Sequence, residues 1–191
     1  MLVWKYGREA LSGKAVIVRW MLAALVFAAG FPFVLRSAAG FSKTGEACIN
    51  IYQQQCQMGK FLHRYYDDSV VAANDIGAIS YYKTAENLDL WGLGNIKVAR
   101  SRKNKYWTPA FLDSLTSSEK APVAVVFDSW FSDSLLNRWN RVATWTIPNN
   151  VICGDSVVSF YATGVENRAY LRQSLEAYQK DLPQAVSVRY Y

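Results

Sequence analysis

The hydrophobic pattern of this chain changes character at about residue 40. Residues 20–35 carry no charge, and residues 15–18 extend this apolar run to about the twenty residues that a membrane-spanning helix needs. Arg19 lies inside the longer run, where its side chain can snorkel toward the lipid headgroups. The pattern therefore predicts a transmembrane anchor at residues 15–36.

Basic residues surround this run unequally. Lys5, Arg8 and Lys14 precede it together with Arg19, and Arg36 alone follows it. The positive-inside rule then predicts a cytoplasmic basic arm at residues 1–14 and an extracytoplasmic, periplasmic domain after a single span. A cleavable signal peptide is the alternative, since small residues occupy 37–39. Arg36 and a proline at position 32 favour the uncleaved anchor, and either alternative exports the domain.

Beyond residue 43 the pattern alternates between helix and strand periods. Apolar residues spaced by three and four predict an amphipathic helix at 49–66. A short apolar strand at 70–73 leads into Asn74 and Asp75, which favour helix N-caps, and a helix is expected at 76–82. The strand pattern resumes at 88–91 and ends at Gly92. This strand–helix–strand opening is typical of α/β domains.

The second half of the chain extends the same architecture. We expect a helix at 108–118, a strand buried on both faces at 123–127, and antiparallel strands at 141–147 and 156–162. A final helix at 165–182 is stopped by Pro183, and residues 184–191 are predicted to be a mobile tail. The predicted fold is therefore α/β: an N-terminal transmembrane helix followed by a small, three-layer-like domain with a mixed sheet at residues 43–183.

The distribution of charge along the chain bears on whether the protein binds nucleic acid. The net charge is +6. Residues 1–42 hold five basic residues and one acidic residue, so most of the excess belongs to the N-terminal arm. The globular part is nearly balanced, and we therefore expect no nucleic-acid partner.

Polar and aromatic residues at predicted strand ends are the ligand-binding candidates, because ligands of α/β domains bind at the carboxyl ends of strands. They are Asn74, Asp75, Asp89, Trp91 and Asp128. The structural alternatives are a helix cap for Asp75 and a turn contact for Asp89. The sequence holds no dinucleotide fingerprint, P-loop, nucleophile elbow or metal-ligand spacing, and its one histidine, His63, has no partner nucleophile. No catalytic residue, metal or cofactor is predicted.

Five cations without an acid lie between positions 97 and 105: Lys97, Arg100, Arg102, Lys103 and Lys105. Helical periodicity is absent, so a loop is expected here. This loop either serves solubility or contacts the phosphate groups of membrane lipid or of a polyprenyl-phosphate carrier. Tyr106 and Trp107 follow it and suit a membrane interface.

The three cysteines permit at most one disulfide within the chain. Cys48 and Cys56 are about 12 Å apart along the predicted helix, too far to be bridged. Cys153 either pairs with one of them in an oxidising compartment or all three are buried thiols.

The phrase VAANDIGAISYY…LDLWGL resembles the extracytoplasmic C-terminal domain of GT-C membrane glycosyltransferases, the superfamily of protein mannosyltransferases and aminoarabinose transferases. The matching positions are Asp75, Ile76, Gly77, Ala78, Tyr81, Leu88, Asp89, Leu90, Gly92 and Leu93. A weaker similarity continues through residues 123–128 and 145–148, so that it covers most of residues 43–162. In that class the donor is a polyprenyl-phosphate sugar, and catalysis depends on an acidic residue in the first extracytoplasmic loop.

This chain has one hydrophobic segment and no such loop. The resemblance therefore implies an accessory domain without the catalytic core. The expected function is that of a membrane-anchored domain that contacts a glycan, a lipid-linked sugar or a multi-spanning partner subunit. The alternatives are a fragment or subunit of an active glycosyltransferase, in which Asp75 or Asp89 joins a shared active site, and a structural assembly subunit of a membrane complex.

Overall fold

The computed structural model describes the backbone of residues 2–191 and the side chains of residues 15–191. The basic arm predicted at 1–14 thus lies outside the residues whose side chains are described. The chain divides into two compact units, Met1–Gly45 and Glu46–Tyr191. Each unit is described separately below.

The first unit consists of helix α1 (Leu2–Ile51), which continues into the second unit. Its apolar side chains from Val16 to Phe41 are exposed, and Pro32 lies within it. Among the described residues this is the one helix that is long and apolar enough to cross a membrane. A candidate transmembrane helix is therefore present at the predicted place, and proline is tolerated in such helices. The orientation across the membrane stays a prediction.

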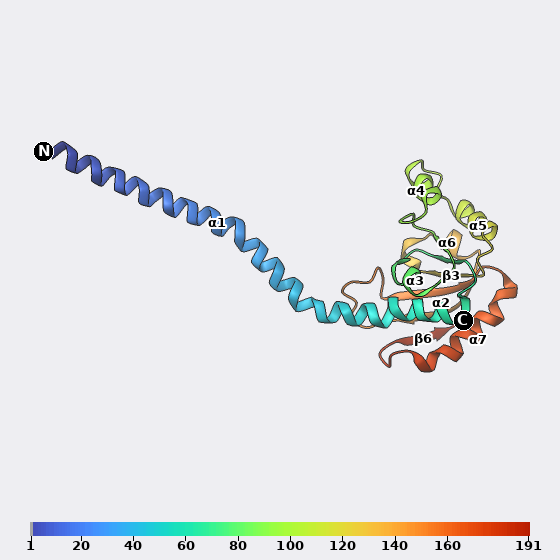
Figure 1. Cartoon of the computed structure of the whole chain (residues 1–191). Helices are drawn as coiled ribbons and strands as arrows, with labels where there is room; N and C mark the ends of the chain where they lie inside the picture. Colours follow the sequence, from blue (N-terminus) through green and yellow to red (C-terminus); the bar gives the residue numbers. More distant parts are fainter. Residues whose placement is uncertain (1) are drawn as a thin grey trace. The chain divides into compact units, whose positions relative to one another are not determined.

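The second unit is an α/β domain built on one mixed sheet, as the sequence predicts (Figure 1). The strand order is β2-β1-β3-β5-β4-β6. The strands are β1 (Val71–Ala73), β2 (Asn87–Asp89), β3 (Val123–Val126), β4 (Asn140–Thr146), β5 (Val157–Ala162) and β6 (Ser187–Tyr190). The first three pair in parallel, and the remaining pairs are antiparallel. All four residues of β3 are buried, as expected for a strand covered on both faces.

Two hydrophobic clusters cover the two faces of this sheet. One is formed with α2 (Gln57–Tyr66), α3 (Gly77–Tyr82) and α7 (Arg168–Tyr178), and Phe61 is its aromatic centre. The other is formed with α4 (Ile96–Lys103), α5 (Pro109–Ser118) and α6 (Asp133–Leu136), which Figure 1 shows gathered on one side of the domain. Helices on both faces make the domain three-layered.

Close contact between α2 and α3 depends on one glycine. A Cβ added to Gly59 would lie 2.6 Å from Cδ2 of Tyr82 and 2.9 Å from the carbonyl oxygen of Ala78. Any side chain at position 59 would push the two helices apart. Between α1 and α2 the helix widens into a π-helical turn (Tyr52–Cys56), a geometry often found near functional sites.

Two sequence predictions are wrong. Residues 97–105 are not a loop, because Ile96–Lys103 forms α4. The side chain of Asn95 caps this helix by accepting from the backbone N–H groups of Lys97 and Val98. The helix buries only Val98 and Ser101, which is too narrow a stripe to produce a visible helical period. The last residues are not a mobile tail, because β6 pairs with β4 and Val186 is buried.

Candidate functional site

β1 and β3 are parallel neighbours, and the connections that follow β1 and precede β3 run to opposite sides of β1, so the strand order reverses between them. From β1 the chain first passes through α3 to β2, and then through α4 and α5 to β3 on the other side of β1. Ligands of open α/β sheets bind outside the carboxyl ends of strands at such a switch point. We call the residues that follow β1, β2 and β3, together with the β4–β5 loop that contacts them, the carboxyl edge.

Asn74 joins the two strands at this edge. Its Oδ1 accepts a hydrogen bond from the backbone N–H of Phe127 at 3.1 Å, and the residue is buried. Phe127 directly follows β3, so this bond holds the ends of β1 and β3 in register. Asn74 therefore positions the backbone of the edge.

Asp75 is half-buried beside the π-helical turn. Its Oδ2 accepts a hydrogen bond from Nε2 of Gln55 at 2.8 Å. Burial raises the pKa of Asp75, and the hydrogen bonds from the Gly77 backbone and from Gln55 oppose this rise. The predicted capping role is confirmed in part: α3 begins after Ile76, one residue later than an Asp75 N-cap requires, but the Asp75 carboxylate accepts from the backbone N–H of Gly77, the first residue of the helix. Asp75 is thus a partly desolvated carboxylate beside a helix start.

Asp89 organises the turn after β2. Its Oδ1 accepts from the backbone N–H groups of Trp91 and Gly92 at 2.8 and 2.9 Å, and its Oδ2 accepts from those of Gly94 and Asn95 at 2.5 and 3.3 Å. The residue is 1% exposed. Gly92 has φ +87°, the left-handed conformation that a turn glycine adopts readily. The turn role that the sequence offers for Asp89 is confirmed.

Trp91 belongs to an aromatic group that the sequence did not bring together. Its ring centroid lies 4.6 Å from that of Trp130, which follows β3, and 5.5 Å from that of Trp107. The guanidinium of Arg102 lies 3.9 Å from the Trp91 centroid and donates to the Trp91 carbonyl oxygen. Trp91 and Trp130 are only half-buried. Two indoles from different connections therefore form an aromatic platform at the carboxyl edge.

Asp128 is held by two side chains of the neighbouring strands. Arg141 Nη2 lies 2.6 Å from its Oδ2, and the hydroxyl of Tyr161 donates to its Oδ1 at 2.9 Å. Arg141 also donates to the hydroxyl of Tyr161. Burial raises the pKa of Tyr161. This triad ties the end of β3 to β4 and β5, so Asp128 is part of the scaffold.

The β4–β5 loop completes the edge. A Cβ at Gly154 would lie 2.8 Å from both Trp130 Cζ2 and Phe127 Cε2, so the loop packs directly on the platform. Ser129 donates a hydrogen bond to the carboxylate of Asp155. Burial and, to a smaller extent, the charge of Asp75 raise the pKa of the Cys153 thiol to about 11. All three cysteines are free thiols, and that of Cys153 is protonated at neutral pH.

Three residues of this site, Gln55, Trp130 and Ser129, are not among the candidates that the sequence predicts. Trp130 follows a buried strand directly, and this was the available signal. Gln55 gave none, because a glutamine inside a helical pattern ordinarily faces solvent. Within the described residues, Gln55 Oε1 and Asn74 Nδ2 are buried without a hydrogen-bond partner.

The five cations of the predicted cluster at 97–105 have two different environments in the structure. Arg102 stacks on Trp91 and belongs to the platform. Lys97, Arg100, Lys103 and Lys105 are exposed on α4 and the turn that follows it. Arg102 is exposed as well, so within the described residues the four differ from it in making no side-chain hydrogen bond, ion pair or ring contact.

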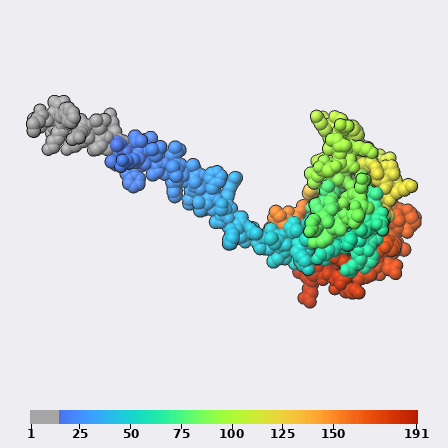
Figure 2. All heavy atoms as spheres, viewed as in Figure 1, coloured from blue at the N-terminus to red at the C-terminus, as the bar shows by residue number. Residues whose placement is uncertain are grey.

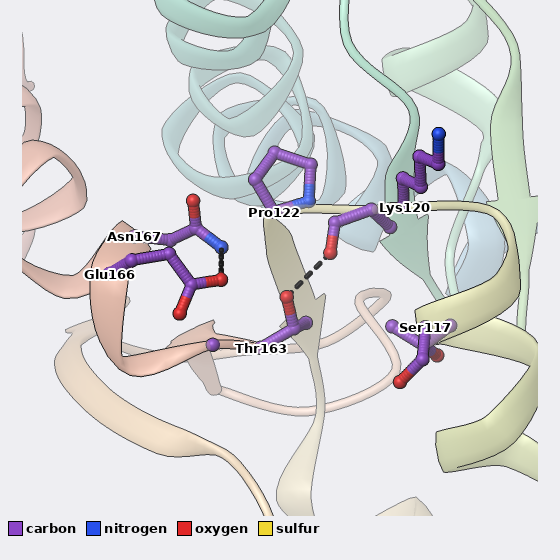
Figure 3. A pocket seen from close by; sticks show the side chains of 9 residues that line it. Ser117, Lys120, Pro122, Thr163, Glu166 and Asn167 are labelled. Atoms are coloured by element: carbon purple, nitrogen blue, oxygen red, sulfur yellow. Dashed lines mark hydrogen bonds between the residues drawn. The ribbon is translucent and has the colours of Figure 1, made fainter.

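A separate open cleft of about 380 Å³ lies at the opposite edge of the sheet, before β3 and after β5 (Figure 3). Figure 3 shows Lys120 and Glu166 on different walls, with Thr163 donating to the Ala121 carbonyl oxygen between them. None of the sequence candidates lies in this cleft. In residues 15–191 no group of three or more His, Cys, Asp or Glu side chains could hold a metal ion. His63 pairs with Asp67 at 3.0 Å on the surface.

Comparison with known proteins identifies one family. No curated protein and no solved structure matches the chain. The sequence profile of a family described as a domain of unknown function (DUF8728) matches residues 49–161. This range runs from the end of α1 to β5 and includes every residue of the aromatic platform. The chain therefore belongs to the DUF8728 family.

Proposed function

We propose that this protein is a membrane-anchored, extracytoplasmic binding domain whose carboxyl edge takes a carbohydrate, either a glycan or the sugar of a polyprenyl-phosphate carrier. The proposal assigns no reaction to the chain alone. A multi-spanning glycosyltransferase is the partner that the sequence resemblance suggests.

The contact between Trp91 and Trp130 is the observation that carries this proposal. Their centroids are 4.6 Å apart, and both indoles remain partly accessible. Indole rings offer a large apolar face and one N–H donor, which suits the alternation of apolar and hydroxyl surface on a sugar ring. A core cluster would bury both rings, as it does for Trp145.

Polar groups adjoin the platform on two sides. Asp75, held by Gln55, is close enough to Cys153 for its charge to raise the pKa of that thiol, and Gly154, the neighbour of Cys153, packs on Trp130. Ser129 and Asp155 lie next to Trp130 and Gly154 in the chain and bond to each other. Carboxylate, amide and hydroxyl groups around an apolar surface are the groups that fix the orientation of a hydroxyl-rich ligand.

Binding is tested on the full chain in detergent. Isothermal titration with a panel of oligosaccharides and a short-chain polyprenyl-phosphate sugar should find at least one ligand. Trp130→Ala should weaken its binding at least about tenfold, which corresponds to 1.4 kcal/mol. The matched control, Trp20→Ala, changes an exposed indole of α1 and should bind like the parent. No binding to the panel, or unchanged affinity in Trp130→Ala, would contradict the proposal.

Topology is tested in cells. The excess of Lys and Arg before the apolar run supports a cytoplasmic N-terminus and an exported domain. A reporter that works only in the cytoplasm, fused after Tyr191, should stay inactive. Strong reporter activity there would overturn the proposed orientation.

A further inference from the structure

Residues 93–106, which we call the α4 tip, form a small folded projection with both ends fixed. Asn95 caps the start of α4. At the end, Tyr106 N–H donates to the Ser101 carbonyl oxygen and Lys105 N–H to that of Arg102, with Lys105 at φ 62°. This pattern is a Schellman motif. Figure 2 shows the light-green atoms of this region standing out from the rest of the domain.

The tip presents positive charge without an acid of its own. Lys97, Arg100, Lys103 and Lys105 are exposed, and no Asp or Glu lies between positions 93 and 106. Within the part of the chain whose side chains are described, these four cations make no hydrogen bond or ion pair through their side chains. Two acids from outside the tip, Glu86 and Glu119, line a groove together with Lys97.

Large apolar side chains are exposed on the same tip. Leu93 is 71% exposed, Ile96 63% and Tyr106 46%. A helix that serves only solubility needs charges and no exposed leucine or isoleucine. Cations mixed with exposed aliphatic and aromatic residues are the composition of segments that lie in the headgroup region of a membrane.

We infer that the α4 tip binds the surface of an anionic lipid bilayer. Its four accessible cations would contact lipid phosphates, while Leu93, Ile96 and Tyr106 would enter the headgroup region. The same chain carries a candidate transmembrane helix, so a bilayer is the surface at hand. This inference uses residues outside the aromatic platform, and its test does not depend on carbohydrate binding.

The test uses the full chain in nanodiscs of phosphatidylcholine, with and without phosphatidylglycerol, and measures hydrogen–deuterium exchange at 93–106. Exchange should be several-fold slower in the anionic discs at about 0.05 M salt and should recover at about 0.5 M salt, because salt screens exposed charges. Equal exchange in both lipids would overturn the inference. Protection by inorganic phosphate in detergent, without a bilayer, would indicate a phosphate site and would also overturn it.

Two variants and one control separate binding from folding. The charge variant Lys97→Gln/Arg100→Gln/Lys103→Gln/Lys105→Gln should lose the lipid-dependent protection, and Leu93→Ser/Ile96→Ser should weaken it with every charge kept. The matched control replaces four exposed cations elsewhere: Lys120, Arg168, Lys180 and Arg189 to Gln. It should keep the protection. Unchanged exchange in β3 and β5 shows that each variant is folded. Loss of protection in the control, or its persistence in the charge variant, would refute the inference.

Discussion

We expect the stability of the turn after β2 to depend on the Asp89 side chain more than on any other side chain of that turn. Asp89→Ala removes the acceptor of four backbone N–H groups, those of Trp91, Gly92, Gly94 and Asn95. The two inner donors, on Trp91 and Gly92, are half-buried, whereas Gly94 is exposed and can bond to water. Asn95 is half-buried as well, but its bond of 3.3 Å is the longest of the four. The loss should therefore come chiefly from the inner pair.

The expected loss in the free energy of unfolding can be estimated from the two hydrogen bonds that Trp91 and Gly92 donate. A hydrogen bond to a charged group contributes roughly 1.5–3 kcal/mol, so two of them give about 3–6 kcal/mol. Whole domains are stable by only about 5–15 kcal/mol. Asp89→Asn should lose a large part of the same free energy, because one side of its amide carries N–H donors that would face two backbone donors.

Urea unfolding of the full chain in detergent, followed by tryptophan fluorescence, measures the change in the free energy of unfolding. The matched control is Asp68→Ala, which replaces an exposed aspartate and should change stability by less than about 0.5 kcal/mol. An Asp89→Ala variant as stable as this control would show that the carboxylate does not hold the turn.

Three further predictions concern other elements. Burial raises the pKa of Asp75 above its unfolded value of about 3.9, so the folded state loses stability as pH rises through and above that value. Asp75→Asn should thus unfold at higher urea than the parent at pH 7 and lose this advantage below about pH 4; a less stable variant at pH 7 would contradict the burial argument. Lys120 has φ 52° in the turn after α5, so Lys120→Gly should gain about 0.5–1 kcal/mol in the same assay, and a loss would argue against left-handed strain. Deleting residues 184–191 removes β6 and the buried Val186, and should cost at least about 2 kcal/mol. An unchanged thermal midpoint would restore the mobile-tail interpretation.

The sequence predicts the central strands and most of the helices because their signals are local. Thr108 and Pro109 begin α5 as a cap and a first helical residue, and the Thr108 hydroxyl does accept from the Phe111 backbone. α4 was missed because only two of its residues are buried. Its one clear signal is Asn95, a residue type that favours the N-cap position.

The candidate site was predictable only in part. Asp89 acts within six residues of itself, and its turn role could be inferred. The bonds from Asp128 to Arg141 and Tyr161 join residues 13 and 33 positions apart, and they depend on strand order, which no local pattern gives. The contact between Trp91 and Trp130 has the same origin. The sequence predicts only Trp91 as a site residue. The position of Trp130 after a buried strand is a weak signal, because a single indole is equally compatible with an ordinary core position.

The glycine between α2 and α3 has an evolutionary consequence. Position 59 tolerates no Cβ, because the backbone of Ala78 and the ring of Tyr82 fill the space. Selection should therefore keep glycine in this column across the DUF8728 family, even in members whose platform residues differ. Where the column does change, residue 82 should change with it toward a smaller side chain, and α3 should be displaced because the Ala78 contact is made by the backbone. An alignment of family members would thus separate the requirements of the scaffold, seen at position 59, from those of the proposed binding, seen at positions 91 and 130.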